Sequence, residues 1–192
     1  YFETIHKQVI TYSNNRMIID AMAEFSSAYA MRSNEADLSN ISSMKRSVEG
    51  YYREHFSSTY QAKNNGTVPE LSALTVNLSD TSIALQYGYM SNNKYPLGEK
   101  NSLNANGSGS QYDQVHEKFH PFINQYLTEF HYYDIFLVDM QGNMVYSVFK
   151  EGDYATSLVN GPYANSGLAQ AYREAQKLND RDKSILIDFK PY

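Results

Sequence analysis

The stretch YYDIFLVDMQGNMVYSVFK, residues 132–150, decides the fold class of this 192-residue chain. It contains two runs rich in β-branched and aromatic residues, 133–139 and 143–149, joined by a Met-Gln-Gly-Asn turn. This pattern predicts a β-hairpin. Because the first run is apolar on both faces, we expect it to be a central strand that is covered on both sides.

Helices are predicted on both sides of the hairpin, because apolar residues recur there every three or four positions. Ser33 or Asn34 should end the first helix and cap the second, which Asn64-Asn65-Gly66 should terminate. With only a short loop between them, these two helices should pack as an antiparallel pair. The expected helices span 1–32, about 36–63, about 80–90, 111–130 and about 166–178.

The stretch SILIDFK, residues 184–190, predicts a further strand. Three strands make a marginal sheet with an unpaired edge, so we expect more strands to follow Tyr192. The chain is therefore predicted to be α+β, with long N-terminal helices packed on an antiparallel sheet that is incomplete at the C-terminus. We expect a helical region over 1–110 and a sheet-bearing domain over 111–192.

Composition narrows the range of functions. The net charge is −5 and basic residues are not clustered, which disfavours nucleic acid as a partner. No cysteine is present, so disulfides, thiolate metal sites and a cysteine nucleophile are excluded. No apolar run reaches the roughly 20 residues that span a bilayer, and no signal peptide opens the chain. The 18 tyrosines suit polar-ligand pockets and interfaces alike.

The stretch HEKFHP, residues 116–121, spells the helix motif of zinc proteases, in which two histidines four apart bind zinc and a glutamate activates water. A catalytic zinc needs a third protein ligand, and the positions that supply it in the extended motif hold Ile123 and Tyr126. Pro121 should also distort the helix at His120. We therefore interpret His116, Glu117 and His120 as a chance match, with a zinc hydrolase as the alternative.

The stretch YYDIFLVDMQGNMVYSVFKEGDYATSLVNGPYANSGLAQAYREA, residues 132–175, resembles the Cache-type (PAS-like) sensor domains of bacterial methyl-accepting chemotaxis proteins. Related domains occur on histidine kinases and nucleotide cyclases. The stretch YFETIHKQVITYSNNRMIIDAMAEF, residues 1–25, resembles the long helix that follows the first transmembrane segment in that family. The resemblance implies a PAS-like antiparallel sheet, further strands after Asp188-Phe189-x-Pro191-Tyr192, and a membrane-anchored parent protein. The Arg-x-Trp-Tyr motif of amino-acid-binding members is missing here, because the chain has no tryptophan.

A small-molecule pocket is expected between the sheet and the loop that follows it. The end of the second strand and this loop offer charges of both signs, a hydroxyl and aromatic walls, which such sites require. Tyr154 and Tyr163 either wall this pocket or plug the loop onto the sheet, and Lys150 and Asp153 either bind the ligand or pair on the surface. The candidate ligand-binding residues are Tyr146, Phe149, Lys150, Asp153, Tyr154, Thr156, Tyr163 and Asp188.

The resulting hypothesis is an extracytoplasmic, periplasmic sensor domain of an inner-membrane chemoreceptor that binds a small molecule, needs no cofactor and catalyses no reaction. The alternative is that the domain is the sensor of a histidine kinase or a nucleotide cyclase. A further alternative is a cytoplasmic PAS-like module that holds haem or flavin. The absence of cysteine excludes the type that forms a flavin adduct. A homodimer through the N-terminal helix is also expected, because its apolar stripe could serve a partner as well as the core.

Overall fold

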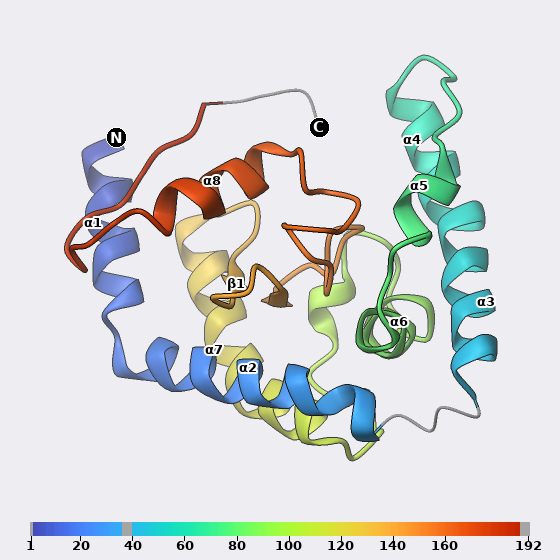
Figure 1. Cartoon of the computed structure of the whole chain (residues 1–192), viewed down its shortest axis with the longest axis horizontal. Helices are drawn as coiled ribbons and strands as arrows, with labels where there is room; N and C mark the ends of the chain where they lie inside the picture. Colours follow the sequence, from blue (N-terminus) through green and yellow to red (C-terminus); the bar gives the residue numbers. More distant parts are fainter. Residues whose placement is uncertain (1, 36–39, 189–192) are drawn as a thin grey trace.

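A computed structural model describes residues 2–35 and 40–188 of the chain. Helices surround a small antiparallel hairpin in the middle of the molecule (Figure 1). The predicted α+β class is confirmed. The finer expectation of a PAS-like sheet is not, because the sheet within the described residues has only the two strands of the hairpin.

The long helix predicted over 1–32 is broken into two. The two helices are α1 (Phe2–Ser13) and α2 (Arg16–Glu35). The break falls at Asn14 and Asn15, where the Asn15 side chain accepts a hydrogen bond from the backbone N–H of Met17 at 2.8 Å. Asparagine side chains commonly start a helix in this way, and α1 turns away from α2 here (Figure 1). The predicted break at Ser33 or Asn34 is wrong, because α2 continues to Glu35.

The second predicted helix is present from Ile41 to Lys63, and its expected first residues, 36–39, lie outside the described residues. It is assigned as α3 (Ile41–Tyr51), the π-helical turn η2 (Tyr52–Phe56) and α4 (Ser57–Lys63). It ends as predicted, with Asn65 and Gly66 at φ 52° and 82°. The predicted pairing with the first helix is wrong. Helix α3 packs on the helical residues 80–91, while α2 packs mainly on the helix over residues 111–130.

Between residues 67 and 110 the chain forms short elements. They are α5 (Leu71–Thr75), which was not predicted, α6 (Asp80–Gln86), η3 (Tyr87–Ser91) and the 3₁₀ turn η4 (Lys100–Ser102). Ser79 caps α6, accepting the Ser82 N–H at 3.1 Å. Helix α6 is buried from Thr81 to Gln86, because α2 and α3 both pack on it.

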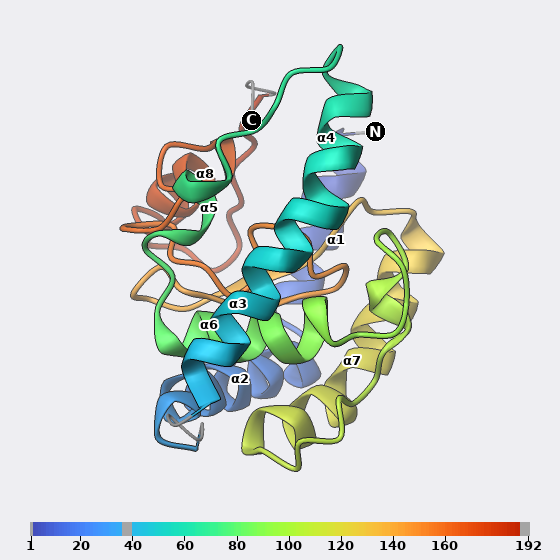
Figure 2. The same ribbon diagram turned by 90° about the vertical axis from the view of Figure 1, so that its right-hand side faces the viewer.

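Helix α7 (Gln111–Phe130) has the predicted bounds and is capped by Ser110, which accepts the Asp113 N–H at 3.1 Å. It crosses α2 and forms the largest helix–helix contact of the described structure (Figure 2). The helix runs through Pro121 without a break, so the distortion expected at His120 is not observed.

The hairpin consists of β1 (Phe136–Val138) and β2 (Met144–Ser147), which are shorter than predicted. Leu137 pairs with Tyr146 and Val138 with Met144, so Val145 is an extra residue in β2. The expectation that the first strand is the covered one is wrong, because β2 is buried along its whole length and β1 is half-buried. Helix α2 packs against β2, which accounts for the difference.

Helix α8 (Gly167–Ala175) follows, capped by Ser166, and ends about three residues before the predicted end. The strand predicted for 184–190 is not formed over 184–188, and its last residues lie outside the described part. This extended tail returns beside α1 (Figure 1), where Ser184 hydrogen-bonds to His6 and Asn14 donates to Asp182 at 3.5 Å. No sheet edge lies next to the tail in the described structure, so it has no strand to pair with.

The main core joins the two regions that the sequence suggested. One cluster of buried residues draws on α2, α3, α6, α7 and β2, and much of it is tyrosine. Its largest fully buried side chains include Phe25, Tyr52, Tyr89, Tyr112 and Tyr146. A smaller cluster around Met144, Leu158 and Ala169 holds α8 to the other face of the hairpin.

Candidate functional site

The predicted ligand-binding residues occupy three environments. Tyr146, Lys150, Tyr154 and Thr156 are fully buried and Asp153 is buried; Phe149 and Tyr163 are half-buried; Asp188 is exposed in the tail. The loop after β2 is thus packed into the core rather than lying open as a flap. The structure brings the first five residues together. Asp188 was expected to join them through a strand of the sheet, but it lies in the exposed tail and belongs to no strand.

The segment 150–156 is tied to three helical elements by side chains that donate to its backbone carbonyls. Tyr29 of α2 reaches the Ala155 carbonyl at 3.2 Å, Tyr52 of η2 reaches Gly152 at 2.9 Å, and Gln86 of α6 reaches Tyr154 at 2.8 Å. Lys150 and Ala155 have φ of 53° and 60°, an unusual conformation for residues other than glycine. This buried segment is therefore held by polar contacts that were not predicted.

A chain of hydroxyl groups links the same segment to the hairpin. Tyr154 donates to the Tyr112 hydroxyl at 3.0 Å, and Tyr112 donates to the carbonyl of Val145 at 2.7 Å. Val145 is the extra residue of β2, so its carbonyl depends on a side chain for a hydrogen bond. Burial raises the pKa of both phenols, which keeps them protonated as donors.

Lys150 is the most unusual side chain of the site. Its ammonium lies 2.9 Å from the Val148 carbonyl, 3.3 Å from His120 Nδ1 and 5.1 Å from the centre of the Tyr146 ring. It makes no ion pair with any residue that the structure describes. Burial lowers the pKa of Lys150 well below its ordinary value, against the electrostatic effect of Asp134.

Asp134 lies half-buried just before β1 and was not predicted to belong to the site. It accepts the backbone N–H groups of Ile135 at 2.6 Å and Val148 at 2.8 Å. Burial raises its pKa to about 7. The site therefore contains a carboxyl group and an amine that burial pushes toward their neutral forms.

The two histidines of HEKFHP are buried and point their ring nitrogens at the loop before α7. His116 Nδ1 donates to the Asn104 carbonyl at 2.7 Å and His120 Nε2 donates to the Asn101 carbonyl at 2.7 Å. His120 Nδ1 is 2.6 Å from the Tyr146 hydroxyl, which therefore donates to it. The rings stack with their centres 4.3 Å apart. Burial, followed by the charge of Lys150, lowers the pKa of both imidazoles, that of His120 to about 3.

This arrangement does not favour a zinc site. Three of the four ring nitrogens of the pair are engaged in hydrogen bonds, and Glu117 is exposed. No group of three or more histidine, aspartate or glutamate side chains that could hold a metal occurs in residues 2–35 and 40–188. The histidines instead attach a loop to α7.

We call this loop, residues 101–105, the strap; it runs alongside α7 (Figure 2). Besides the two histidines, Asn124 of α7 accepts from the Asn101 side chain at 2.9 Å. Just beyond the strap, the Asp113 carboxylate accepts the Asn106 N–H at 2.6 Å and the Tyr89 hydroxyl at 2.7 Å. One face of α7 thus bonds to the loop over three helical turns.

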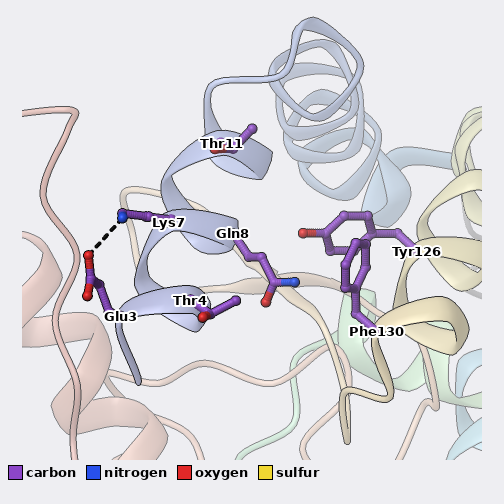
Figure 3. A pocket seen from close by; sticks show the side chains of 7 residues that line it. All are labelled: Glu3, Thr4, Lys7, Gln8, Thr11, Tyr126 and Phe130. Carbon is purple, nitrogen blue, oxygen red and sulfur yellow. Dashed lines mark hydrogen bonds and ion pairs between the residues drawn. The ribbon is translucent and has the colours of Figure 1, made fainter. Parts of the chain in front are cut away.

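The surface also has an open groove between α1 and α7 (Figure 3). It has a volume of about 430 Å³ and is lined by Glu3, Thr4, Lys7, Gln8, Thr11, Tyr126 and Phe130. Tyr12 stacks on Tyr126 beside it, with ring centres 3.8 Å apart. None of the predicted ligand-binding residues lines this groove.

Comparison of the chain with protein-family models, with curated proteins and with solved structures gave no match. The resemblance to Cache-type domains therefore stays a prediction from the sequence. Within residues 2–35 and 40–188, no helix combines the length and the apolar character needed to cross a bilayer.

Proposed function

We propose that this chain is the extracytoplasmic, periplasmic ligand-sensing domain of a bacterial inner-membrane chemoreceptor, and that it binds a small molecule without transforming it. The output could equally belong to a histidine kinase or a nucleotide cyclase. The supporting observation is that five predicted ligand-binding residues lie together in a buried polar cluster. That cluster is bonded to α2, η2 and α6, which lie far from it along the chain.

Signalling follows from these bonds if the ligand favours one arrangement of the cluster. A ligand shifts an equilibrium between two arrangements only by its difference in affinity for them, and a hundredfold preference supplies about 2.7 kcal/mol. Movement of segment 150–156 would act directly on α2 through Tyr29. Helix α1 directly precedes α2 in the chain and has no buried residue. We propose α1 as the route toward the membrane.

Helix α1 also supports the proposed homodimer. Phe2 and Val9 are large apolar side chains that remain 66% and 46% exposed. A second copy could cover them, with Phe122 and Phe130 on the neighbouring surface of α7 exposed as well. The open groove of Figure 3 lies along the same seam between α1 and α7.

Isothermal titration calorimetry with pooled organic acids, amino acids and amines tests the sensing function. We expect one compound to bind at about one molecule per chain and to raise the melting temperature, because ligands that bind only the folded state stabilise it. A folded protein that binds no compound in any pool, and whose melting temperature no pool changes, would contradict the proposal. Sedimentation at increasing protein concentration tests the dimer separately.

A further inference from the structure

The open groove between α1 and α7 adjoins a second hollow along the same two helices. The groove of Figure 3 has a volume of about 430 Å³, and the second hollow has a volume of about 360 Å³. Thr11, Tyr126 and Phe130 line both of them, and we call the two together the seam groove. Each volume lies within the range of small-molecule sites, which is about 300–1,000 Å³.

The α7 wall of the seam groove is aromatic. Phe122, Tyr126 and Phe130 recur every four residues, so their rings lie on one face of the helix. Phe122 and Phe130 remain 58% and 46% exposed. Tyr126 is supported by Tyr12, which stacks on it at 3.8 Å, and by Phe130, whose ring centre is 4.6 Å away. Exposed rings that are supported in this way offer flat apolar faces on which a ligand can stack.

The α1 wall of the seam groove is polar and uncharged at three positions. Thr4, Gln8 and Thr11 are spaced three or four apart and line the groove from one face of α1. The Gln8 carbonyl accepts the Tyr132 hydroxyl at 2.7 Å, which leaves the amide N–H groups of Gln8 without a partner among the residues that the structure describes. The two threonine hydroxyls and the Tyr126 hydroxyl, which points across the groove toward α1 (Figure 3), likewise have no partner in residues 2–35 and 40–188. These groups are available to a ligand that carries both donors and acceptors.

Charge in the seam groove is nearly balanced. Glu3 and Lys7 pair with each other at 2.7 Å, and this exposed pair points away from the rings (Figure 3). Glu129 is the remaining charged side chain that lines the groove within the described residues, and it is exposed. The groove therefore suits a neutral ligand with apolar faces for the rings and hydroxyl groups for the polar wall. A saccharide combines both, because the C–H groups of a pyranose form an apolar face and its hydroxyls project from the rim.

We propose that the seam groove binds a neutral saccharide of one or two rings. The sugar stacks on Tyr126 and Phe130 and forms hydrogen bonds with Thr4, Gln8 and Thr11. This site is separate from the buried cluster of the proposed function, and it goes beyond that function. A sugar bound here bridges α1 to α7, and it excludes a second copy of the chain from the same rings.

The test titrates the whole chain with maltose, cellobiose and N,N′-diacetylchitobiose over a range of protein concentrations. Choline, succinate and a capped hexaproline peptide are the cationic, anionic and peptide controls. Binding is followed by calorimetry and by saturation-transfer difference NMR, which identifies the ligand protons that contact the protein. We expect at least one disaccharide to bind, with the strongest saturation at the C–H groups of one ring face, and the three controls to be inert.

Two pairs of variants locate the site. Phe130→Leu keeps an exposed apolar side chain but removes the flat ring, and it should weaken disaccharide binding about fivefold. Thr11→Val removes one hydroxyl at nearly constant shape and should also weaken binding about fivefold. Phe2→Leu and Thr67→Val make the same changes at exposed residues that line neither hollow, so they should leave the affinity unchanged.

Three results would overturn the proposal. The first is that no disaccharide binds at any protein concentration. The second is that Phe130→Leu and Thr11→Val bind the sugar as well as the wild type, or lose no more affinity than their matched controls, which would place the sugar elsewhere. The third is that choline, succinate or the peptide binds in place of the disaccharides. The sensing function is tested separately by the pools of acids, amino acids and amines.

Discussion

The hydroxyl chain from Tyr154 through Tyr112 to the Val145 carbonyl predicts an asymmetric double-mutant cycle. Tyr154 is only a donor in this chain, whereas Tyr112 accepts one hydrogen bond and donates another. Tyr154→Phe leaves the Tyr112 bond to Val145 intact and should cost about 1 kcal/mol of unfolding free energy. Tyr112→Phe leaves both a buried hydroxyl and a buried carbonyl without a partner, and should cost about 3 kcal/mol.

The double variant is the decisive measurement. It removes the Tyr154 hydroxyl that Tyr112→Phe alone would strand, so only the Val145 carbonyl stays unpaired. We expect it to lose about 2 kcal/mol, less than Tyr112→Phe alone. The free energies are measured by urea denaturation followed by circular dichroism, and each kcal/mol should also move the melting temperature by about 2–4 °C.

Tyr87→Phe is the matched control, since the Tyr87 hydroxyl has no hydrogen-bond partner among the described residues and its loss should change stability by less than about 0.5 kcal/mol. Two results would refute the reasoning. One is an equal loss in both single variants, which would mean that the bonds do not run in this direction. The other is a double variant whose loss equals the sum of the two, which would mean that the hydroxyls do not interact.

Two further predictions concern pH and backbone space. Because buried His116 and His120 resist protonation, unfolding takes up protons below about pH 6.5, and each imidazole should remove up to about 1.4 kcal/mol of stability per pH unit toward pH 3. Asp134, with its pKa raised to about 7, takes up a proton in the folded state and so opposes this loss of stability between about pH 4 and 7. Asp134→Asn should therefore make the unfolding free energy, measured by urea denaturation, fall more steeply as the pH is lowered. An unchanged dependence of stability on pH would contradict this role of Asp134. Gly161→Ala should destabilise the protein by about 2 kcal/mol or more, since its Cβ would lie 2.4 Å from the backbone oxygen of Ser157. The matched control is Gly167→Ala, whose Cβ would meet nothing within 4 Å and which should be nearly neutral. Thermal unfolding measures both variants.

Much of the secondary structure could be predicted because its causes are local. The bounds of α7 follow from its apolar periodicity, and the start of α8 was predicted to within a residue, although α8 ends at Ala175 rather than near residue 178. The break at Asn14 and Asn15 was missed because apolar residues have helical spacing on either side of it, although residues 13–16 are all polar. The strand expected over 184–190 was wrong over the described residues for a different reason, since a strand needs a partner whose position local sequence does not encode.

The candidate site was less predictable than the fold. The chemistry of Lys150, Asp153, Tyr154 and Thr156 predicts a ligand-binding loop, whereas the structure places these side chains in the core. Their partners Tyr29, Tyr52 and Gln86 were missed because each sits on an otherwise apolar helix face and bonds to backbone far away in the chain. A buried glutamine within an apolar helix was the one signal that sequence could have offered, since such a group needs a hydrogen-bond partner.

The same partners explain why the core is built from tyrosine. The hairpin is short and is followed by irregular backbone, so several buried carbonyls have no neighbouring strand to satisfy them. Tyr29, Tyr52 and Tyr112 each reach such a carbonyl from a different helical element while adding apolar area to the core. A phenylalanine would fill the same space but leave the carbonyl unpaired. The helices are consequently positioned by the conformation of the loop, and a displacement of that loop must break bonds to several of them at once.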